Sequence, residues 1–276
     1  MPEKPLVCLG EAWLELEADT APELAGQFAV QVGGWGAALC RAYARCGGPV
    51  VLLSQLGADP FGRKIAARLA ADGVDCSRLC FTGAACTAVV FWGTAGEPVA
   101  VRAPSAEQLL APEQLDRAAF RGAGAFCFSS VGLTDCPLRL THLTALAAAR
   151  DAGALCCYAP RLAEAAAFWP EGETLAQTAR QFFPQADVLL LKESDLLPLF
   201  GSRELRTALF ALFTGHVQLI FYSALDKNLL FTRNVMAEHA QNGLTEAEFL
   251  HRLVELDLGP GQLSGLRQTQ LQQLLL

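Results

Sequence analysis

Short apolar runs of strand length alternate along the whole chain with stretches in which apolar residues recur at helical spacing. This alternation predicts an α/β fold with a mostly parallel central sheet and right-handed crossovers. No internal repeat or low-complexity linker divides it, so a single domain over residues 1–276 is expected. The predicted strands are residues 5–10, 50–56, 125–130, 154–158, 187–191 and 217–223, and the predicted helices are residues 35–46, 60–72, 137–152, 174–182, 194–214 in two pieces and 245–256.

Two segments interrupt the alternation, residues 12–32 and residues 86–103. Both have the period-two character of extended chain, as in Phe28, Val30 and Val32. They predict a small separate β-sheet that forms a lid. Such an excursion from an α/β body commonly covers a cleft, and ligands of open α/β sheets bind beyond the carboxyl ends of the strands.

A glycine cluster stands between the first of these segments and a predicted helix, at Gly33, Gly34 and Gly36. A dinucleotide-binding fingerprint would need Gly or Ala at the position of Leu39, so that match is incomplete. Two interpretations stay open. One is a tight strand-to-helix turn, and the other is a turn whose backbone closely approaches a small ligand.

The helix predicted over residues 60–72 is marked at both ends. Asp59 is a candidate N-cap, Pro60 suits the first helical position, and Gly73 suits the position after the end. The glycine spacing in this region also matches part of a P-loop. Arg and Lys follow where that loop needs Lys and then Ser or Thr, which disfavours a P-loop.

Composition narrows the class of protein. With 52% hydrophobic and 18% charged residues, the chain can bury a large core and is expected to be globular. Its formal charge of −7 has the wrong sign for binding phosphate backbones or anionic lipid, so nucleic-acid and membrane partners are not expected. Residues 79–96 are uncharged, but their glycines favour strands and turns over a membrane span. The N-terminus has no signal-peptide core, which predicts a cytoplasmic location.

The ten cysteines do not form a recognisable disulfide or zinc pattern. Cys8, Cys127, Cys156 and Cys157 fall inside apolar strand-like runs, which indicates core packing. The chain has no CxxC pair, and its histidines do not stand beside the cysteines, so no metal site is predicted.

Two motifs, in this order and spacing, carry a resemblance to a known family. The pair Gly33-Gly34 opens a helix, and the pattern GxDxFGxxxAxxLxxxGVD follows at residues 57–75. Together they resemble the N-terminal signature of the PfkB (ribokinase-like) family of ATP-dependent carbohydrate kinases, and the likeness extends over most of the chain. The resemblance implies a three-layer α/β/α fold with a β lid, ATP and Mg²⁺ as cofactors, a sugar or sugar-acid ligand, and a homodimer formed through the lid. The fructokinase and 2-keto-3-deoxygluconate kinase types are the expected relatives.

The resemblance also implies site residues at the positions that match the family's motifs. Glu15 stands where the family has a sugar-contacting Asp, and Arg102 belongs to the lid segment. Lys192 and Asp195 fall on a block that organises metal and phosphate in the family. The implied substrate-binding residues are Glu15, Gly33, Gly34 and Arg102, and the implied nucleotide or phosphate residues are Lys192, Asp195 and Ser223.

Several family positions are changed in this chain. Ala38 replaces an Asn, and residues 159–163 replace a DPNxR-like block. From Phe231 onward there is no GAGD motif, whose amides hold the transferred phosphoryl group and whose Asp is the general base. The stretch TEAEFLHRLVELD at residues 245–257 resembles the helix that follows that motif at a distance. Because losing the base costs about 10²–10⁴ in rate and losing an anion-stabilising donor about 10²–10³, the chain is expected to be an impaired or inactive kinase.

Two alternatives stay open. An active kinase would need an acid from elsewhere, such as Asp195 or Asp257, because no catalytic residue is assigned and Ser129 and Ser130 lack a triad. A structural or regulatory protein that forms oligomers is the other alternative. An amphipathic face near the C-terminus is expected to dock, either within the chain or on a partner, through Leu266, Leu271, Leu274 and Leu275.

Overall fold

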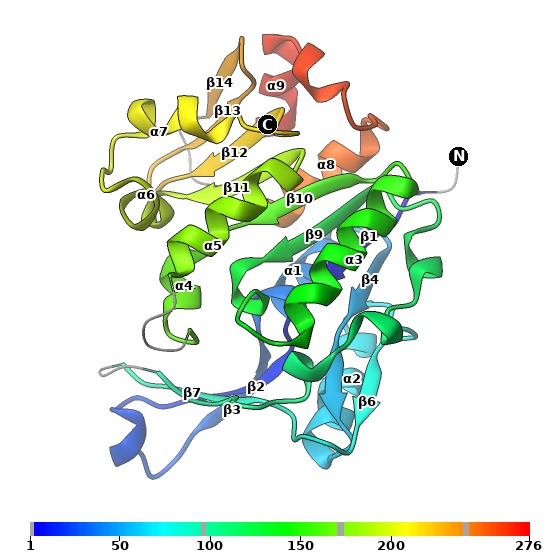
Figure 1. Ribbon diagram of the computed structural model, residues 1–276. Helices are drawn as coiled ribbons and strands as arrows, with labels where there is room; N and C mark the ends of the chain where they lie inside the picture. Colours follow the sequence, from blue (N-terminus) through cyan, green and yellow to red (C-terminus); the bar gives the residue numbers. More distant parts are fainter. Residues whose placement is uncertain (1–2, 95–97, 170–173, 240–242) are drawn as a thin grey trace.

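The computed structural model describes residues 3–94, 98–169, 174–239 and 243–276 (Figure 1). In this part of the chain, a central sheet of eight strands has the order β14-β13-β12-β11-β10-β9-β1-β4. The strands from β4 through β12 in this sheet are parallel, whereas β13 and β14 add an antiparallel hairpin at one edge. The bounds are β1 (Leu6–Leu9), β4 (Val50–Leu53), β9 (Ala125–Ser129), β10 (Leu155–Ala159), β11 (Val188–Lys192), β12 (Leu219–Ser223), β13 (Asn228–Phe231) and β14 (Met236–His239).

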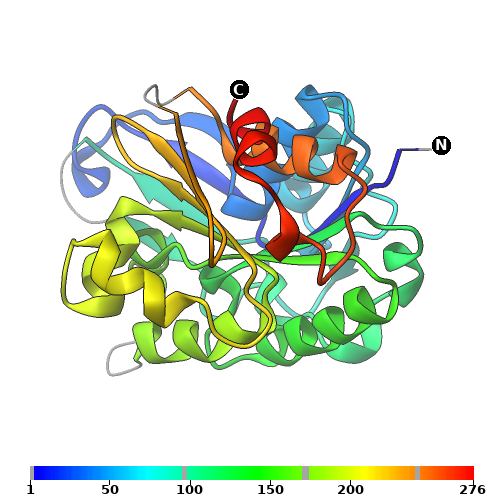
Figure 2. The same ribbon diagram turned by 90° about the horizontal axis from the view of Figure 1, so that it is seen from above.

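Helices cover both faces of the central sheet, and each face has its own apolar core (Figure 2). One face is covered by α1 (Trp35–Arg45), α2 (Pro60–Ala71), α8 (Glu246–Glu255) and α9 (Gln268–Leu275). The other face is covered by α3 (Pro137–Asp151), α4 (Leu162–Ala166), α5 (Leu175–Phe182), α6 (Glu193–Phe200) and α7 (Leu205–Leu212). The predicted three-layer α/β/α arrangement is confirmed. Short 3₁₀ helices lie at Pro22–Leu24, Glu107–Leu109, Pro112–Gln114, Arg117–Phe120, Ser130–Gly132, Phe183–Gln185 and Leu263–Gly265.

The two segments that interrupt the alternation form a separate small sheet, as predicted. Its strand order is β3-β2-β7-β8, with bounds β2 (Trp13–Glu17), β3 (Ala29–Gly33), β7 (Val89–Trp92) and β8 (Val99–Val101). Strand β1 leads into β2 after only three residues, so the small sheet lies beyond the carboxyl end of β1 (Figure 1). This is the end of a parallel sheet at which ligands bind.

The predicted strand over residues 50–56 is wrong as a single element. The chain leaves the central sheet after β4, and β5 (Gln55–Gly57) pairs instead with β6 (Cys80–Thr82) in a two-stranded sheet. The fully buried Gln55 side chain donates a hydrogen bond to the carbonyl of Ala106 at 2.8 Å. This bond holds β5 in its position outside the central sheet. The hairpin β13–β14, the short helix α4 and the helix α9 were not among the predicted elements.

The four cysteines that were predicted to pack in the core, Cys8, Cys127, Cys156 and Cys157, are all buried. Cys8, Cys127 and Cys157 stand at paired positions on three neighbouring strands, and all three are fully buried. All ten cysteines are free thiols. Burial raises the pKa of Cys156 to about 12, which keeps this thiol protonated and unreactive at neutral pH.

The C-terminal apolar face docks within the chain. Leu266, Leu271, Leu274 and Leu275 are buried in the core that α1 and α8 share. The intramolecular alternative for this face is therefore confirmed. Within the described residues, no helix combines the length and the apolar character that crossing a membrane would require.

Candidate functional site

Two adjoining clefts lie where the carboxyl ends of the central strands meet the small sheet. We call the first the small-sheet cleft; it has a volume of about 440 Å³, and its walls include Glu11, Trp13, Glu15, Gly33, Gly34 and Lys192. We call the second the α8 cleft; it has a volume of about 360 Å³, and its walls include Arg161, Lys192, Ser223, Thr245 and Glu246. Both clefts share Trp35, Ala38 and Lys192, so they form one continuous site.

The glycine turn before α1 brings the start of this helix against the end of β1. Gly34 has φ of 95°, and a Cβ there would lie 2.6 Å from the carbonyl oxygen of Glu11. A Cβ on Gly36 would lie 2.8 Å from the Cα of Gly10. Glycine is therefore required at both positions, because a side chain would push α1 away from β1. These contacts support the interpretation as a tight strand-to-helix turn, while the close approach of its backbone to a ligand stays a prediction.

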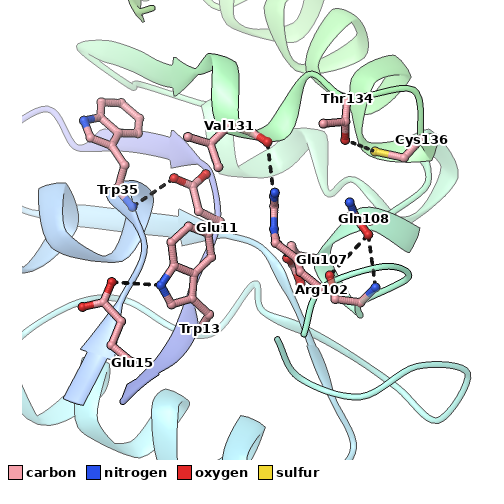
Figure 3. A network of polar contacts seen from close by, with 11 residues as sticks. Glu11, Trp13, Glu15, Trp35, Arg102, Glu107, Gln108, Val131, Thr134 and Cys136 are labelled. Atoms are coloured by element: carbon pink, nitrogen blue, oxygen red, sulfur yellow. Dashed lines mark hydrogen bonds and ion pairs between the residues drawn. The ribbon is translucent and has the colours of Figure 1, made fainter. Parts of the chain in front are cut away.

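Glu11 lies in the small-sheet cleft and was not among the residues expected from the sequence. It is fully buried, and its Oε1 accepts a hydrogen bond from the amide of Trp35 at 2.9 Å (Figure 3). Its Oε2 has no hydrogen-bond partner among the described residues. Burial raises the pKa of Glu11, while Arg102 acts in the opposite direction. An acidic residue directly after a buried strand was the available signal.

Glu15 lies in the same cleft, on the small sheet. Its Oε1 accepts a hydrogen bond from Nε1 of Trp13 at 2.9 Å (Figure 3). Its side chain passes directly over Gly33, where a Cβ would lie 2.0 Å from Oε1. The structure therefore brings together three of the four residues implied for substrate binding, namely Glu15, Gly33 and Gly34.

Arg102, the fourth, faces a different cavity. Its Nε pairs with Oε1 of Glu107 at 2.8 Å, and its Nη2 donates to the carbonyl of Val131 at 3.2 Å (Figure 3). The guanidinium lies 5.4 Å from the ring centre of Trp13 and 5.3 Å from that of Phe168. It lines a neighbouring cavity of about 560 Å³ and not the small-sheet cleft. These contacts hold the small sheet against the body of the protein.

Lys192 and Ser223 end neighbouring strands at paired positions and both line the α8 cleft. The ammonium of Lys192 forms an ion pair with Glu164. Asp195 is fully buried below them and lines neither cleft. Its Oδ1 accepts from the amide of Leu162 at 2.7 Å, and its Oδ2 accepts from the amide of Lys192 at 3.0 Å. Both oxygens of Asp195 therefore serve to join α4 to the start of α6.

The helix α8 begins at the second cleft, which corrects one expectation. Thr245 and Glu248 form a capping box: Oγ1 of Thr245 accepts from the amide of Glu248 at 3.3 Å, and Oε2 of Glu248 accepts from the amide of Thr245 at 2.8 Å. The largely buried Glu246 side chain forms an ion pair with Arg161. A helix was expected over residues 245–256 but was assigned no part in the site, whereas the structure places its N-terminus and the Glu246 carboxylate at this cleft. The signal was the capping-box sequence itself.

The GAGD sequence is nevertheless absent from this place. The positively charged residue that faces α8 is Arg161, which is buried and has a rare backbone conformation. Arg161 has left-handed backbone, with φ of 51°, and only 3% of its surface is exposed. Its Nη1 has no hydrogen-bond acceptor among the described residues. Burial lowers the pKa of Arg161, while nearby carboxylates including Glu164 oppose this effect. Glu246 and Arg161 thus face each other at the N-terminus of α8.

Asp257 lies at the opposite end of the sheet. It forms an ion pair with Lys4, which precedes β1, so it lies at the amino ends of the strands. The ten residues of α8 separate it from the α8 cleft, a rise of about 15 Å. The suggestion that Asp257 supplies the missing acid is wrong on this geometry.

The residues present do not fit the Mg²⁺ ion that the resemblance implies. Magnesium needs several oxygen ligands, usually carboxylates and water. At the matching block the chain has the Lys192 ammonium and Asp195, whose oxygens already accept backbone amides. Among the described residues, no group of three or more His, Cys, Asp or Glu side chains is placed to hold a metal ion.

Comparison with known sequences identifies relatives. The family model described as pfkB family carbohydrate kinase matches residues 3–235. Fructokinase-1 of Zea mays is 34% identical over 198 residues, which are 68% of this chain and 61% of the maize protein. Probable fructokinase-7 of Arabidopsis thaliana is 31% identical over 71% of this chain and 59% of its own length. The chain thus spans about three fifths of the length of these curated relatives.

Solved structures share the fold. A fructokinase from Xylella fastidiosa with bound ATP superposes with a TM-score of 0.87 and 24% identity, covering 99% of this chain and 90% of that chain. An aminoimidazole riboside kinase from Salmonella enterica, solved with aminoimidazole riboside and an ATP analogue, has a TM-score of 0.80 at 20% identity and covers 99% of this chain and 91% of that chain. The predicted ribokinase-like architecture is confirmed.

Proposed function

The chain belongs to the pfkB family of carbohydrate kinases, and from this premise we propose that it binds a sugar in the small-sheet cleft but transfers phosphate from ATP much more slowly than an active kinase. A cleft with carboxylate oxygens beside an aromatic ring suits a sugar, because hydroxyls donate to the oxygens and the C–H faces pack on the ring. Glu15 and Trp13 are placed for these contacts.

The observation that carries the proposal of slow transfer is the pairing of charges in the α8 cleft. Lys192 pairs with Glu164, and Arg161 pairs with Glu246, so each of these cations is already neutralised by the chain itself. A triphosphate needs cations that are free to bind it and a metal ion to spread its charge. Binding ATP here would require breaking an ion pair and leaving a carboxylate beside the phosphates.

The test is to measure sugar binding and phosphate transfer with the same preparation of the full chain. Calorimetry against fructose, other neutral hexoses and 2-keto-3-deoxygluconate is expected to detect binding of at least one sugar. A coupled ATP assay with the same sugars is expected to give turnover well below about 1 s⁻¹, the low end for typical enzymes. Turnover near or above that value would overturn the proposal of slow transfer, and binding of no sugar would overturn the proposal as a whole.

A second candidate function is an active kinase in which Glu246 accepts the proton from the sugar hydroxyl. The observation in its favour is that α8 begins at the cleft with Glu246 in its first turn, because a helix N-terminus stabilises nearby negative charge. If this candidate is right, Glu246→Gln lowers turnover by about 10²-fold or more. The matched control is Glu255→Gln at the far end of α8, which leaves turnover unchanged. Equal rates for both variants exclude Glu246 as the base.

We also propose that two copies of the chain form a dimer through the small sheet, and that this dimer has a regulatory role. The edge strands of this sheet are β3 and β8. Val30 on β3 is 48% exposed, and Val99 and Val101 on β8 are 48% and 63% exposed. Unpaired edge strands with apolar side chains are suited to pairing with a second chain. Light scattering at high protein concentration is expected to detect a dimer, and a strict monomer would contradict this role.

A further inference from the structure

The small-sheet cleft carries an excess of unneutralised carboxylate. Its charged walls, within the described residues, are Glu11, Glu15, Glu164, Arg41 and Lys192. The two cations are both occupied. Arg41 pairs with Asp72, a residue outside the cleft, at 2.6 Å, and Lys192 pairs with Glu164.

Within the described chain, the hydrogen bonds that Glu11 and Glu15 accept come only from neutral groups. Glu11 accepts from the Trp35 amide, and Glu15 accepts from the Trp13 indole (Figure 3). Arg102 acts electrostatically on Glu11, but it is paired with Glu107. The two carboxylates therefore present negative charge to whatever enters the cleft.

One carboxylate oxygen in this cleft is buried and unsatisfied. Glu11 is fully buried, and its Oε2 has no hydrogen-bond partner among the described residues. An unpaired buried acceptor costs about 1–3 kcal/mol, so such atoms usually bind a ligand or water. A donor that enters the cleft and carries positive charge would satisfy this oxygen most strongly, because charge-assisted hydrogen bonds are about twice as strong as neutral ones.

Aromatic rings form much of the remaining wall of the small-sheet cleft. Trp13, Trp35, Trp92 and Phe168 all line the small-sheet cleft. Their faces attract the C–H groups of a sugar ring, and they also attract a cation. A negatively charged ligand gains nothing from these faces and is repelled by the two carboxylates.

We propose that the preferred ligand of the small-sheet cleft is a polyol that carries a primary amine, and that Glu15 selects it over neutral sugars and sugar acids. This inference rests on the proposed function of the cleft as a sugar-binding site. Glu15 is the selecting residue because its side chain is only partly buried, so it can contact a ligand while its Oε1 keeps the hydrogen bond from Trp13. Sugar acids, which the family resemblance also allowed, are disfavoured by the same charges.

The test compares sugars that differ in one functional group and in the charge that it carries. The probes are fructose with 1-amino-1-deoxyfructose, and glucose with 2-amino-2-deoxyglucose and glucuronate. Binding is measured by calorimetry on the full chain at pH 6.5, where amines of this kind are protonated. At least one amine is expected to bind about 10-fold tighter than its neutral parent, equivalent to about 1.4 kcal/mol, and glucuronate to bind more weakly than glucose. Raising the ionic strength should reduce the difference.

Variants of the full chain locate the selectivity. Glu15→Gln is expected to bring the amine and its neutral parent within about twofold of each other, whereas Glu15→Asp keeps the preference because it keeps the charge. The matched control is Glu17→Gln, which removes the same charge two residues further along β2, outside the cleft. This control is expected to keep the preference. Loss of the preference in Glu17→Gln or Glu15→Asp would overturn the role of Glu15.

The outcomes distinguish a failure of this inference from a failure of the proposed sugar-binding function. If neutral sugars bind and no amine has an advantage, the inference is wrong while the sugar-binding function stands. If no probe of any charge binds, the sugar-binding function fails as well. Tighter binding of glucuronate than of glucose would also contradict the inference, because the cleft would then behave as a cationic site.

Discussion

At the scale of single residues, two buried carboxyl groups at strand ends have different roles. Asp195 accepts a backbone amide on each oxygen, so its carboxylate is used within the fold. Glu11 accepts an amide on one oxygen only and leaves the other unpaired among the described residues. The motif comparison pointed to Asp195 and passed over Glu11. A buried carboxylate with an unpaired oxygen has more capacity left for a ligand than one whose two oxygens already accept backbone amides.

The first prediction concerns the pH dependence of stability at Glu11. Because burial raises the pKa of Glu11 in the folded state, the folded chain binds this proton more tightly than the unfolded chain. The ionised group therefore lowers stability as pH rises above the unfolded value of 4.5. The free energy of unfolding of the Glu11→Gln variant is expected to exceed that of the original chain by more at pH 8 than at pH 5. Urea unfolding at both pH values measures this difference. An equal difference at the two pH values would contradict this reasoning.

At the scale of elements, α2 shows how one side chain joins separate parts of the chain. Oδ1 of Asp59 accepts from the amide of Gly62 at 2.8 Å, which confirms the predicted N-cap. Its Oδ2 accepts from the amide of Thr87 at 2.8 Å, so the same carboxylate ties α2 to the segment before β7. Burial opposes ionisation, but the hydrogen bonds outweigh it and lower the pKa of Asp59.

The second prediction follows from this cap. Asp59→Ala is expected to lower the free energy of unfolding by about 1–2 kcal/mol, because amides of Gly62 and Thr87 lose their acceptor. Asp59→Asn should lose less, since its amide oxygen can still cap Gly62. As the folded pKa is lowered, the contribution of Asp59 is present above the unfolded value of 3.8 and is lost as pH falls below it. Urea unfolding of both variants is the measurement, and equal losses for Ala and Asn would argue against the cap.

At the scale of the whole molecule, a buried ion pair links the small sheet to the body. Arg102 follows β8, pairs with Glu107, and donates to the carbonyl of Val131 at the far side of the cavity. Both charged side chains are nearly free of solvent contact, with 4% and 2% of their surfaces exposed. The position of the small sheet over the cleft therefore depends on this pair.

The third prediction is the effect of breaking that pair. Arg102→Ala is expected to lower the free energy of unfolding by about 3–5 kcal/mol, because Glu107 would be left as a buried charge without a partner. The double replacement Arg102→Met with Glu107→Leu removes both charges and should recover most of the loss. Chemical denaturation measures both. A loss of under about 1 kcal/mol for Arg102→Ala would show that the pair does not hold the small sheet.

Much of the fold was predictable from sequence because it depends on local periodicity. The strand around Cys127 and the helix that starts at Pro60 both follow from patterns within about a dozen residues. The site was less predictable. Glu15, Gly33 and Gly34 were placed through motifs and do meet, whereas Arg102 meets Glu107 instead of the cleft. The start of α8 was predictable from its capping box, but the role of Glu246 was missed because it depends on where that helix begins in space.

The sequence by itself determined the alternation of most strands and helices, the two extended segments of the small sheet, and the glycine turn before α1, because each depends on neighbours along the chain. Only the tertiary structure decided which charges meet at the carboxyl ends of the strands. Arg161 and Glu246 are far apart in sequence, and their pairing follows from the packing of α8 on β12, where the ring of Phe249 stacks on that of Phe221. Electrostatics depends on distance in space, and only the packed sheet and helices determine those distances.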